Sequence, residues 1–254
     1  TSYTLASLMS FMYFLECLKL PVLFIFSLNA IVLLNFLYYT FMSAPKINVA
    51  KQAISYISNK LTPSMVIGIG TGSTVNYFIE ELASYSHLFQ GAVSSSDASS
   101  EILESKGIHV YDLNDVNGIE FYIDGADEVD SENNLIKGGG AAHTREKIVA
   151  SAARDFICIV DKSKMVQTLG EFPLPIEVIP QARSLVARRI VSLGGTPELR
   201  VGVKTDQGNE ILDVKNLNLS SPKEMESKLN SIAGVVDNGI FAFQRPSVVL
   251  VSEV

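Results

Sequence analysis

The sequence contains little cysteine, little histidine and no excess of basic residues. Its 254 residues include two cysteines, Cys17 and Cys158, and three histidines, which do not cluster. A structural zinc site needs four closely grouped Cys or His ligands, so this composition argues against one. Lys and Arg number 20 against 27 Asp and Glu, and the resulting net charge of −7 argues against broad nucleic-acid binding. A small anion is still allowed, because it responds to the local charge of its site.

Charged residues are also absent from one long stretch near the N-terminus. The run from Leu20 to Met42 carries none, and about twenty such residues suffice to span a bilayer. Three interpretations stay open: a membrane anchor or uncleaved signal, a targeting segment that is removed, or an upstream extension that the working protein does not carry. The third is favoured, because Met42-Ser-Ala-Pro resembles a natural start.

From Met42 onward, short apolar runs alternate with segments of helical periodicity. Strands are expected at residues 65–70, 91–94, 107–111, 121–123 and 156–160. Helices are expected at residues 49–61, 75–84, 98–106 and 145–153. This alternation predicts an α/β fold with a doubly wound parallel sheet that helices cover on both faces. Ligands of such sheets bind at the carboxyl ends of the strands.

The pattern becomes mixed between Phe172 and about residue 240. Strands are expected at 175–179, 198–203 and 210–214, and helices at 182–193 and 222–232. A last buried strand at 247–251 is expected to return to the main sheet. We therefore predict an apolar extension at 1–41, a catalytic domain at 42–172 plus 241–254, and a small α+β insert at 173–240.

The first chemical motif is Gly70-Thr71-Gly72-Ser73-Thr74, between a predicted strand and a predicted helix. Glycines allow close backbone approach, the Ser73 and Thr74 hydroxyls add donors, and the next helix offers free N–H groups, so the motif suits a phosphate. It is not a P-loop, because no Gly-Lys-Ser/Thr follows, and it lacks the third glycine of a dinucleotide fingerprint. A tight turn needed only for packing is the alternative.

An acidic motif, Asp124-Gly125-Ala126-Asp127-Glu128, follows the predicted strand at 121–123. Three carboxylates within five residues are costly to hold together, and chemistry on hydroxyl groups needs such acceptors. A solvated acidic turn and a magnesium loop are the alternatives, although no further carboxylate is suitably placed in the sequence for a metal.

A triple glycine, Gly138-Gly139-Gly140, lies between Lys137 and a predicted helix. Such a run is costly in backbone entropy, which indicates that the backbone approaches a ligand there. Lys137 can neutralise a developing oxyanion. Glu146, in the first helical turn, can act as a general base if apolar neighbours enclose it. Alternatively, Glu146 only complements the helix dipole, and for His143 we favour a structural role.

The predicted strand at 156–160 carries one cysteine and ends at a fourth motif. Cys158 lies within its apolar run, which is typical of a small buried side chain. Asp161-Lys162-Ser163-Lys164 follows the strand, so one of its lysines can point into the cleft. A surface turn is the alternative.

Together, these motifs resemble those of the A-type ribose-5-phosphate isomerase family. The resemblance runs from about Val49 to near the C-terminus, in order and without large gaps. The matching stretches are 68–74, 94–99, 122–128, 136–142, 144–147, 156–161, 172–180 and 211–213. Three features depart from the family pattern: His143 in place of leucine, the segment 242–246, and the apolar N-terminus.

The resemblance implies a Rossmann-like domain that bears a small ferredoxin-like lid. It implies an enzyme that interconverts D-ribose 5-phosphate and D-ribulose 5-phosphate through an enediolate, in the non-oxidative pentose phosphate pathway. It also implies a cytoplasmic homodimer or homotetramer that needs no cofactor and no metal.

The resemblance also assigns roles to individual residues. Thr71, Gly72, Ser73 and Thr74 would hold the phosphate, and Lys164 would be a further substrate contact. The sugar would be surrounded by Asp124, Gly125, Ala126, Asp127, Lys137, Gly138, Gly139 and Gly140. Glu146 would take the C2 proton and return it to C1, while Lys137 and backbone N–H groups of the triple glycine stabilise the oxyanion. Asp124 would move the hydroxyl proton during ring opening, and Asp127 would orient the sugar hydroxyls.

Two other classes of function remain to be weighed. A sugar-phosphate-sensing regulatory module could use the same scaffold, but no helix-turn-helix pattern or basic segment is found ahead of the predicted domain. A nucleotide-dependent enzyme could use residues 68–73 with Asp97 as the ribose acceptor, but the missing third glycine argues against it. Activity in EDTA without NAD would separate an isomerase from both.

Overall fold

The computed structural model describes residues 28–252 of the chain. Helix α2 (Leu28–Ile57) is the first described element and contains Pro45. The chain divides there into two units, one that ends at Ala44 and one that begins at Pro45. Residues 20–27, where the uncharged run begins, lie outside the described residues. Between residues 28 and 252, no helix is both long and apolar enough to cross a membrane.

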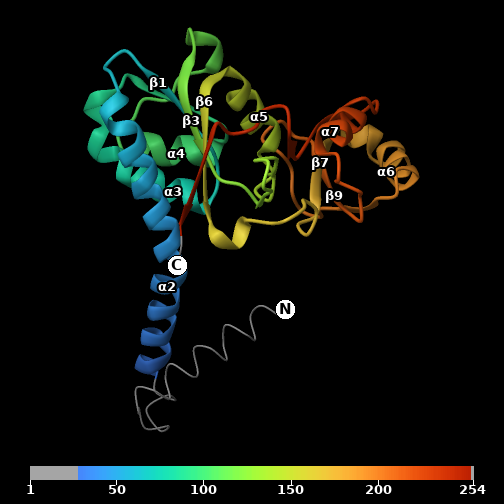
Figure 1. The fold of residues 1–254 in the computed structure, drawn as a ribbon, viewed down its shortest axis with the longest axis horizontal. Helices are drawn as coiled ribbons and strands as arrows, with labels where there is room; N and C mark the ends of the chain where they lie inside the picture. Colours follow the sequence, from blue (N-terminus) through green and yellow to red (C-terminus); the bar gives the residue numbers. More distant parts are fainter. Residues whose placement is uncertain (1–27, 253–254) are drawn as a thin grey trace. The chain divides into compact units, whose positions relative to one another are not determined.

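Five strands form the central sheet of the second unit (Figure 1). Their order is β12-β6-β3-β1-β2, and every neighbouring pair is parallel. The strands are β1 (Val66–Ile69), β2 (Gly91–Ser94), β3 (Ile119–Asp124), β6 (Ala153–Asp161) and β12 (Val248–Ser252). The chain runs from β1 outward to β2 and then returns to β3 on the other side of β1. Ligands of doubly wound sheets bind beside such a reversal, at the carboxyl ends of the strands.

Side chains of the central strands alternate between two hydrophobic cores. Ile67 and Ile69 of β1 pack in one core with α2, α3 (Ser73–Leu82) and α4 (Asp97–Ser105). Val66 lies in the other core, together with Val149 of α5 (His143–Ala152). Because successive side chains of a strand point to opposite faces, helices cover both faces of this sheet, and the predicted doubly wound architecture is confirmed.

Residues 174–238, which we call the insert, form a four-stranded antiparallel sheet with two helices. Its elements follow one another as β7 (Leu174–Val178), α6 (Arg183–Ser192), β8 (Thr196–Leu199), β9 (Glu210–Lys215), α7 (Pro222–Asn230) and β10 (Val235–Asn238). The strand order β10-β7-β9-β8 with this βαββαβ sequence is the ferredoxin-like arrangement. Its own apolar core lies between the sheet and the two helices. In Figure 1 the insert lies on the side of α5 away from the central sheet.

Two predicted strands differ from the observed ones. Residues 107–111 form only a single bridge between Ala92 and Val110 at the edge of the central sheet. The strand expected at 198–203 begins at Thr196 and ends at Leu199, because Gly202, with a φ of 77°, turns the chain soon afterwards.

A small third sheet was not predicted, and it is the part of the fold that assembles the site. Its strands are β4 (Glu128–Val129), β5 (Leu135–Ile136) and β11 (Ile240–Phe241), in the order β11-β5-β4. The β4–β5 pairing is antiparallel, and the Asp127 N–H donates to the carbonyl of Ile136 at 2.8 Å. The acidic motif and the triple glycine, thirteen positions apart in sequence, therefore lie side by side at the end of β3.

Candidate active site

A cavity of about 160 Å³ lies where the loops after β1, β3 and β5 meet. Its lining combines glycines, hydroxyls, lysines and carboxylates. The lining residues are Lys46, Thr71, Gly72, Ser73, Thr74, Gly125, Ala126, Asp127, Lys137, Gly138, Gly139, Gly140, Glu146 and Lys164. Two larger hollows, of about 620 and 530 Å³, lie elsewhere on the surface and bring together no comparable set. All the residues predicted to contact substrate, except Asp124, line the smaller cavity.

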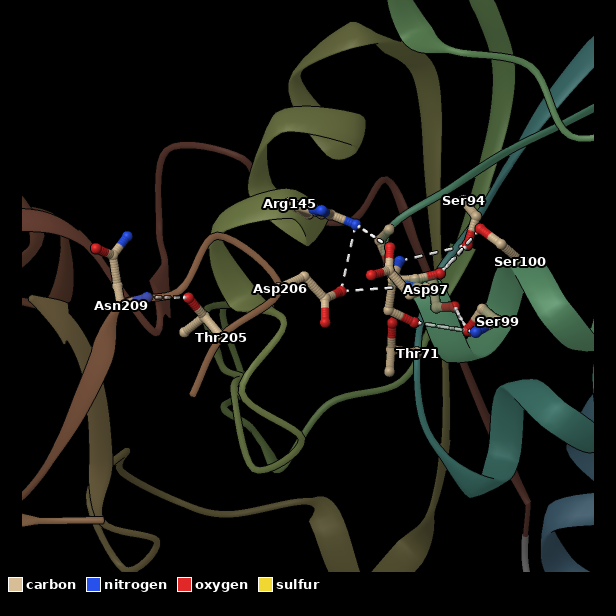
Figure 2. Close-up of polar contacts among 12 residues, drawn as sticks. Thr71, Ser94, Asp97, Ser99, Ser100, Arg145, Thr205, Asp206 and Asn209 are labelled. Atoms are coloured by element: carbon tan, nitrogen blue, oxygen red, sulfur yellow. Dashed lines mark hydrogen bonds and ion pairs between the residues drawn. The ribbon is translucent and has the colours of Figure 1, made fainter. Parts of the chain in front are cut away.

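One end of the cavity has groups that can hold an anion. Gly72, with a φ of 113°, turns the chain between β1 and α3, and the first N–H groups of α3 have no partner within the helix. The Thr71 hydroxyl, labelled in Figure 2, shares a hydrogen bond of 2.8 Å with the Ser95 hydroxyl, which fixes its direction. Free N–H groups at a positive helix end, flanked by hydroxyls, can act as a phosphate cradle.

Lys46 is a functional candidate that the sequence interpretation missed. Its Nζ donates to the Ser73 Oγ at 2.8 Å, so an ammonium group lies beside the cradle. Lys46 lies three and four residues before Val49 and Ala50, which are fully buried on the inner face of α2. This helical spacing was the available signal, because residues at i, i+3 and i+4 share one face of a helix.

Asp124 lies behind the cavity and does not line it. Its side chain is fully buried, and its Oδ1 accepts hydrogen bonds from the N–H groups of Gly125 at 2.7 Å and Thr71 at 3.1 Å. Its Oδ2 accepts from the Tyr122 hydroxyl and pairs with Lys137 Nζ at 2.8 Å. Four donors therefore occupy the carboxylate, and Tyr122 is a second residue that the sequence interpretation missed.

Glycine at position 70 makes room for this carboxylate. A Cβ on Gly70 would lie 1.9 Å from the Cγ of Asp124, far inside van der Waals contact. The loop of residues 70–74 and the Asp124 side chain are thus packed directly against each other, so any side chain at position 70 would displace one of them.

Lys137 joins the two buried carboxylates. Its side chain is 3% exposed, and its Nζ lies 2.8 Å from Asp124 and 3.2 Å from Glu146. The same atom donates to the Gly125 carbonyl at 2.6 Å. Burial would lower the pKa of Lys137, but the Asp124 and Glu146 carboxylates raise it above its ordinary value, so the lysine stays charged.

Glu146 is held in the first turn of α5, and its Oε2 is the atom that pairs with Lys137 Nζ at 3.2 Å. Its side chain is 5% exposed, and no group in the described chain donates a well-directed hydrogen bond to its Oε2. Burial, followed by the charge of Asp124, raises the pKa of Glu146 to about 8, although Lys137 opposes the shift. A carboxylate with a pKa near neutrality that faces a cavity has the properties of a general acid–base group.

The remaining predicted groups divide between cavity and scaffold. Asp127 lines the cavity and accepts from the Gly139 N–H at 2.8 Å. Lys164, at the end of the 3-10 helix η5 (Lys162–Lys164), also lines it. Glu128 points elsewhere and accepts from the N–H groups of Gly170 and Phe172, so the three acidic residues of the motif do not converge.

Two further residues considered in the sequence lie outside the cavity. His143 is fully buried, and burial lowers its pKa to about 4, which fits a structural role. Asp97 pairs with Arg145 at 2.7 Å (Figure 2) and does not line the cavity.

Comparison with known sequences points to one family. Residues 91–253 match the family model described as ribose 5-phosphate isomerase A (phosphoriboisomerase A). Over 211 residues the chain is 57% identical to the ribose-5-phosphate isomerase A of Legionella pneumophila strain Corby, and the match covers 83% of this chain and 96% of the relative.

Solved structures agree with the sequence comparison. The fold is similar to ribose 5-phosphate isomerase A from Neisseria gonorrhoeae, with a TM-score of 0.77, 47% identity, and coverage of 82% of this chain and 92% of the other. A D-ribose-5-phosphate isomerase in complex with phospho-erythronic acid also gives a TM-score of 0.77, at 39% identity and coverage of 82% and 93%.

Proposed function

Because the chain belongs to the ribose 5-phosphate isomerase A family and interconverts D-ribose 5-phosphate and D-ribulose 5-phosphate, we propose that Glu146 is the base that moves its substrate's proton. The observation that carries this proposal is the burial of the Glu146 carboxylate at the cavity, with its Oε2 3.2 Å from Lys137 Nζ and without a well-directed hydrogen bond. The C2 proton of an aldose is weakly acidic, so its removal needs a positioned base and a stabilised enediolate.

Substrate orientation follows from the two ends of the cavity. The cradle of Thr71 to Thr74, with Lys46 beside it, would hold the phosphate. The sugar would then extend toward Lys137 and Glu146. Phospho-erythronic acid, the ligand of one solved relative, carries a phosphate at one end and a carboxylate at the other, and this cavity offers positive charge at both corresponding places.

The proton transfer and the charge stabilisation would use neighbouring groups. Glu146 would accept the proton from C2 and return it to C1. Lys137 and the triple glycine would stabilise the oxygen that gains negative charge; within the triple glycine the Gly140 N–H would be the donor, because the Gly139 N–H already donates to Asp127. Positioned proton transfer contributes about 10²–10⁴-fold, so stabilisation of the enediolate must provide much of the remaining acceleration.

The position of Asp124 favours a role different from the one expected from the sequence. We expected it to move the hydroxyl proton in ring opening. Its oxygens are occupied by Tyr122, Lys137 and two backbone N–H groups, and it does not line the cavity. We propose that Asp124 holds Lys137 charged and in place, and that Asp127, which does line the cavity, handles the sugar hydroxyls.

Assembly and location are proposed from the family resemblance. We propose that the protein works as a cytoplasmic homodimer or homotetramer, with residues 173–240 as a lid domain and residues 1–41 as an extension. Sedimentation of the purified protein would measure its oligomeric state, and mass spectrometry of the native N-terminus would show whether the extension is retained.

The test compares Glu146→Gln with Glu224→Gln. Glu224 is an exposed carboxylate in the first turn of α7, so it controls for the interaction of a first-turn carboxylate with its helix dipole. We expect Glu146→Gln to lose at least about 10²-fold in kcat, while Glu224→Gln keeps the wild-type rate, in EDTA and without NAD. Near-normal turnover of a folded Glu146→Gln protein would overturn the assignment. If the wild type were inactive but bound ribose 5-phosphate, the sensing module would be favoured.

A further inference from the structure

The segment between Lys137 and Glu146 has little internal structure to fix its shape. It links β5 to α5 through three consecutive glycines, and Ala141 within it has a φ of 61°. Glycine has the greatest backbone freedom to lose, so neighbouring elements must hold these residues in place. The insert provides contacts at both ends of the segment.

At the glycine end, the contact is made by Arg200, which follows β8. Its Nη1 donates to the carbonyls of Gly138 at 3.0 Å and Gly139 at 3.1 Å. Its other nitrogens bind the Asp213 carboxylate of β9, with Nε donating to Oδ2 at 2.8 Å. The side chain is only 16% exposed, and this two-sided grip fixes the plane of the guanidinium.

The Arg200 contacts determine where the peptide N–H groups of the glycines point. The Gly138–Gly139 peptide is held on both sides, because its carbonyl accepts from Arg200 and its N–H donates to Asp127 at 2.8 Å. In the Gly139–Gly140 peptide, Arg200 holds the carbonyl, and the N–H of a trans peptide points in the opposite direction. Gly140 lines the cavity and Arg200 does not, so the N–H on the side away from Arg200 is the candidate donor to the cavity.

At the helix end, the insert contacts the first turn of α5 through two other residues. Glu177 of β7 is fully buried and accepts from the Thr144 hydroxyl. Asp206, in the turn between β8 and β9, lies 3.3 Å from Arg145. Figure 2 shows Arg145 between Asp206 and Asp97. Thr144 and Arg145 directly precede Glu146, so the insert contacts both ends of the segment that joins Lys137 to Glu146.

We propose that Arg200 is a positioning residue for the isomerisation, which acts by holding the triple glycine so that the Gly140 N–H meets the developing oxyanion. The proposal rests on the function proposed above. Arg200 does not line the cavity and touches no substrate in this account. Its effect reaches the reaction through the peptides of Gly138 to Gly140.

The test is Arg200→Met, which keeps the aliphatic part of the side chain, with Arg183→Met as the matched control. Arg183 also belongs to the insert and also pairs with a carboxylate of β9, that of Glu210 at 3.2 Å, but it does not reach the glycines. Loss of an oxyanion donor costs about 10²–10³-fold in kcat. Because here the donor is only misaligned, we expect a fall of about 10- to 100-fold.

The KM for ribose 5-phosphate should change less than about threefold in Arg200→Met, because the phosphate end is untouched. Arg200→Lys should recover part of kcat, since one ammonium can reach a carbonyl but cannot also grip Asp213. Wild-type kcat in a folded Arg200→Met protein, or an equal loss in Arg183→Met, would overturn the proposal.

Hydrogen exchange provides a readout that does not depend on activity. Amides in residues 138–146 should exchange faster in Arg200→Met or Arg200→Lys than in Arg183→Met. Unchanged exchange would overturn the positioning role even if Glu146 proved to be the base. Conversely, faster exchange in the Arg200 variants together with an active Glu146→Gln variant would support the positioning role of Arg200. The same result would show that Glu146 is not the base.

Discussion

The most informative single substitution is Glu146→Gln, and the quantity to measure is its free energy of unfolding rather than its activity. Glu146 is a buried carboxylate whose pKa is raised to about 8, whereas in the unfolded chain it titrates near its ordinary value of 4.5. Between these pH values the folded protein binds one proton more than the unfolded chain. The free energy of unfolding therefore contains a contribution that is fully present below pH 4.5 and is lost as pH rises through about 8.

The size of this contribution follows from the two pKa values. At about 1.4 kcal/mol for each tenfold change in affinity, the rise from 4.5 to about 8 sets an upper value of about 5 kcal/mol. Glutamine has the same shape and no charge to bury. The stability of Glu146→Gln relative to wild type should therefore increase by on the order of 3–5 kcal/mol as the pH rises from 5 to 9, while the variant loses activity.

Urea unfolding of wild type, Glu146→Gln and Glu224→Gln at several pH values between 5 and 9 measures this difference. Glu224 is exposed, and the hydrogen bond and charge of Lys228 lower its pKa, so its replacement should not reproduce the gain. If the free energies of unfolding of wild type and Glu146→Gln changed in parallel with pH across this range, the claim that burial raises the pKa of the Glu146 carboxyl would be refuted.

Two further substitutions test residues that the sequence interpretation missed. Tyr122→Phe removes one hydrogen bond to the buried Asp124 carboxylate, so the free energy of unfolding should fall by about 1.5–3 kcal/mol and kcat should fall with it; Tyr111→Phe, at a half-buried tyrosine, is the control, and equal effects at the two positions would contradict the role. Lys46→Met should raise the KM for ribose 5-phosphate about tenfold with little change in kcat, whereas Lys51→Met, which loses only a surface ion pair, should not; an unchanged KM in Lys46→Met would remove Lys46 from the phosphate site.

Much of the fold could be predicted because its strands are buried on both faces. Residues 156–160 form a short continuous apolar run, which is typical of a strand covered on both faces, and their alternating side chains enter the two cores. The mixed pattern after Phe172 correctly indicated an α+β insert. The strand expected at 107–111 was largely wrong. This segment lies at the edge of the sheet and pairs with it only through the bridge between Ala92 and Val110.

The sequence predicted which residues belong to the site, but not which of them line the cavity and which are buried behind it. Cavity residues such as Lys137 and Glu146 follow strand ends and were found by that rule. Asp124 also follows the rule, yet it lies beneath the loop in space left by the absence of a side chain at Gly70. The two-residue strands β4 and β5, which bring Asp127 beside Gly139, are too short for a periodic signal.

The central claim, that Glu146 moves the C2 proton of the substrate, is tested most directly with ribose 5-phosphate deuterated at C2. The wild type should remove the label, and it should appear at C1 of ribulose 5-phosphate or in the solvent, with a primary isotope effect on the rate. A folded Glu146→Gln protein should leave the label at C2 over the same time, while Glu224→Gln behaves as wild type. Loss of the label at the wild-type rate in Glu146→Gln would contradict the account, because another group would then be the base.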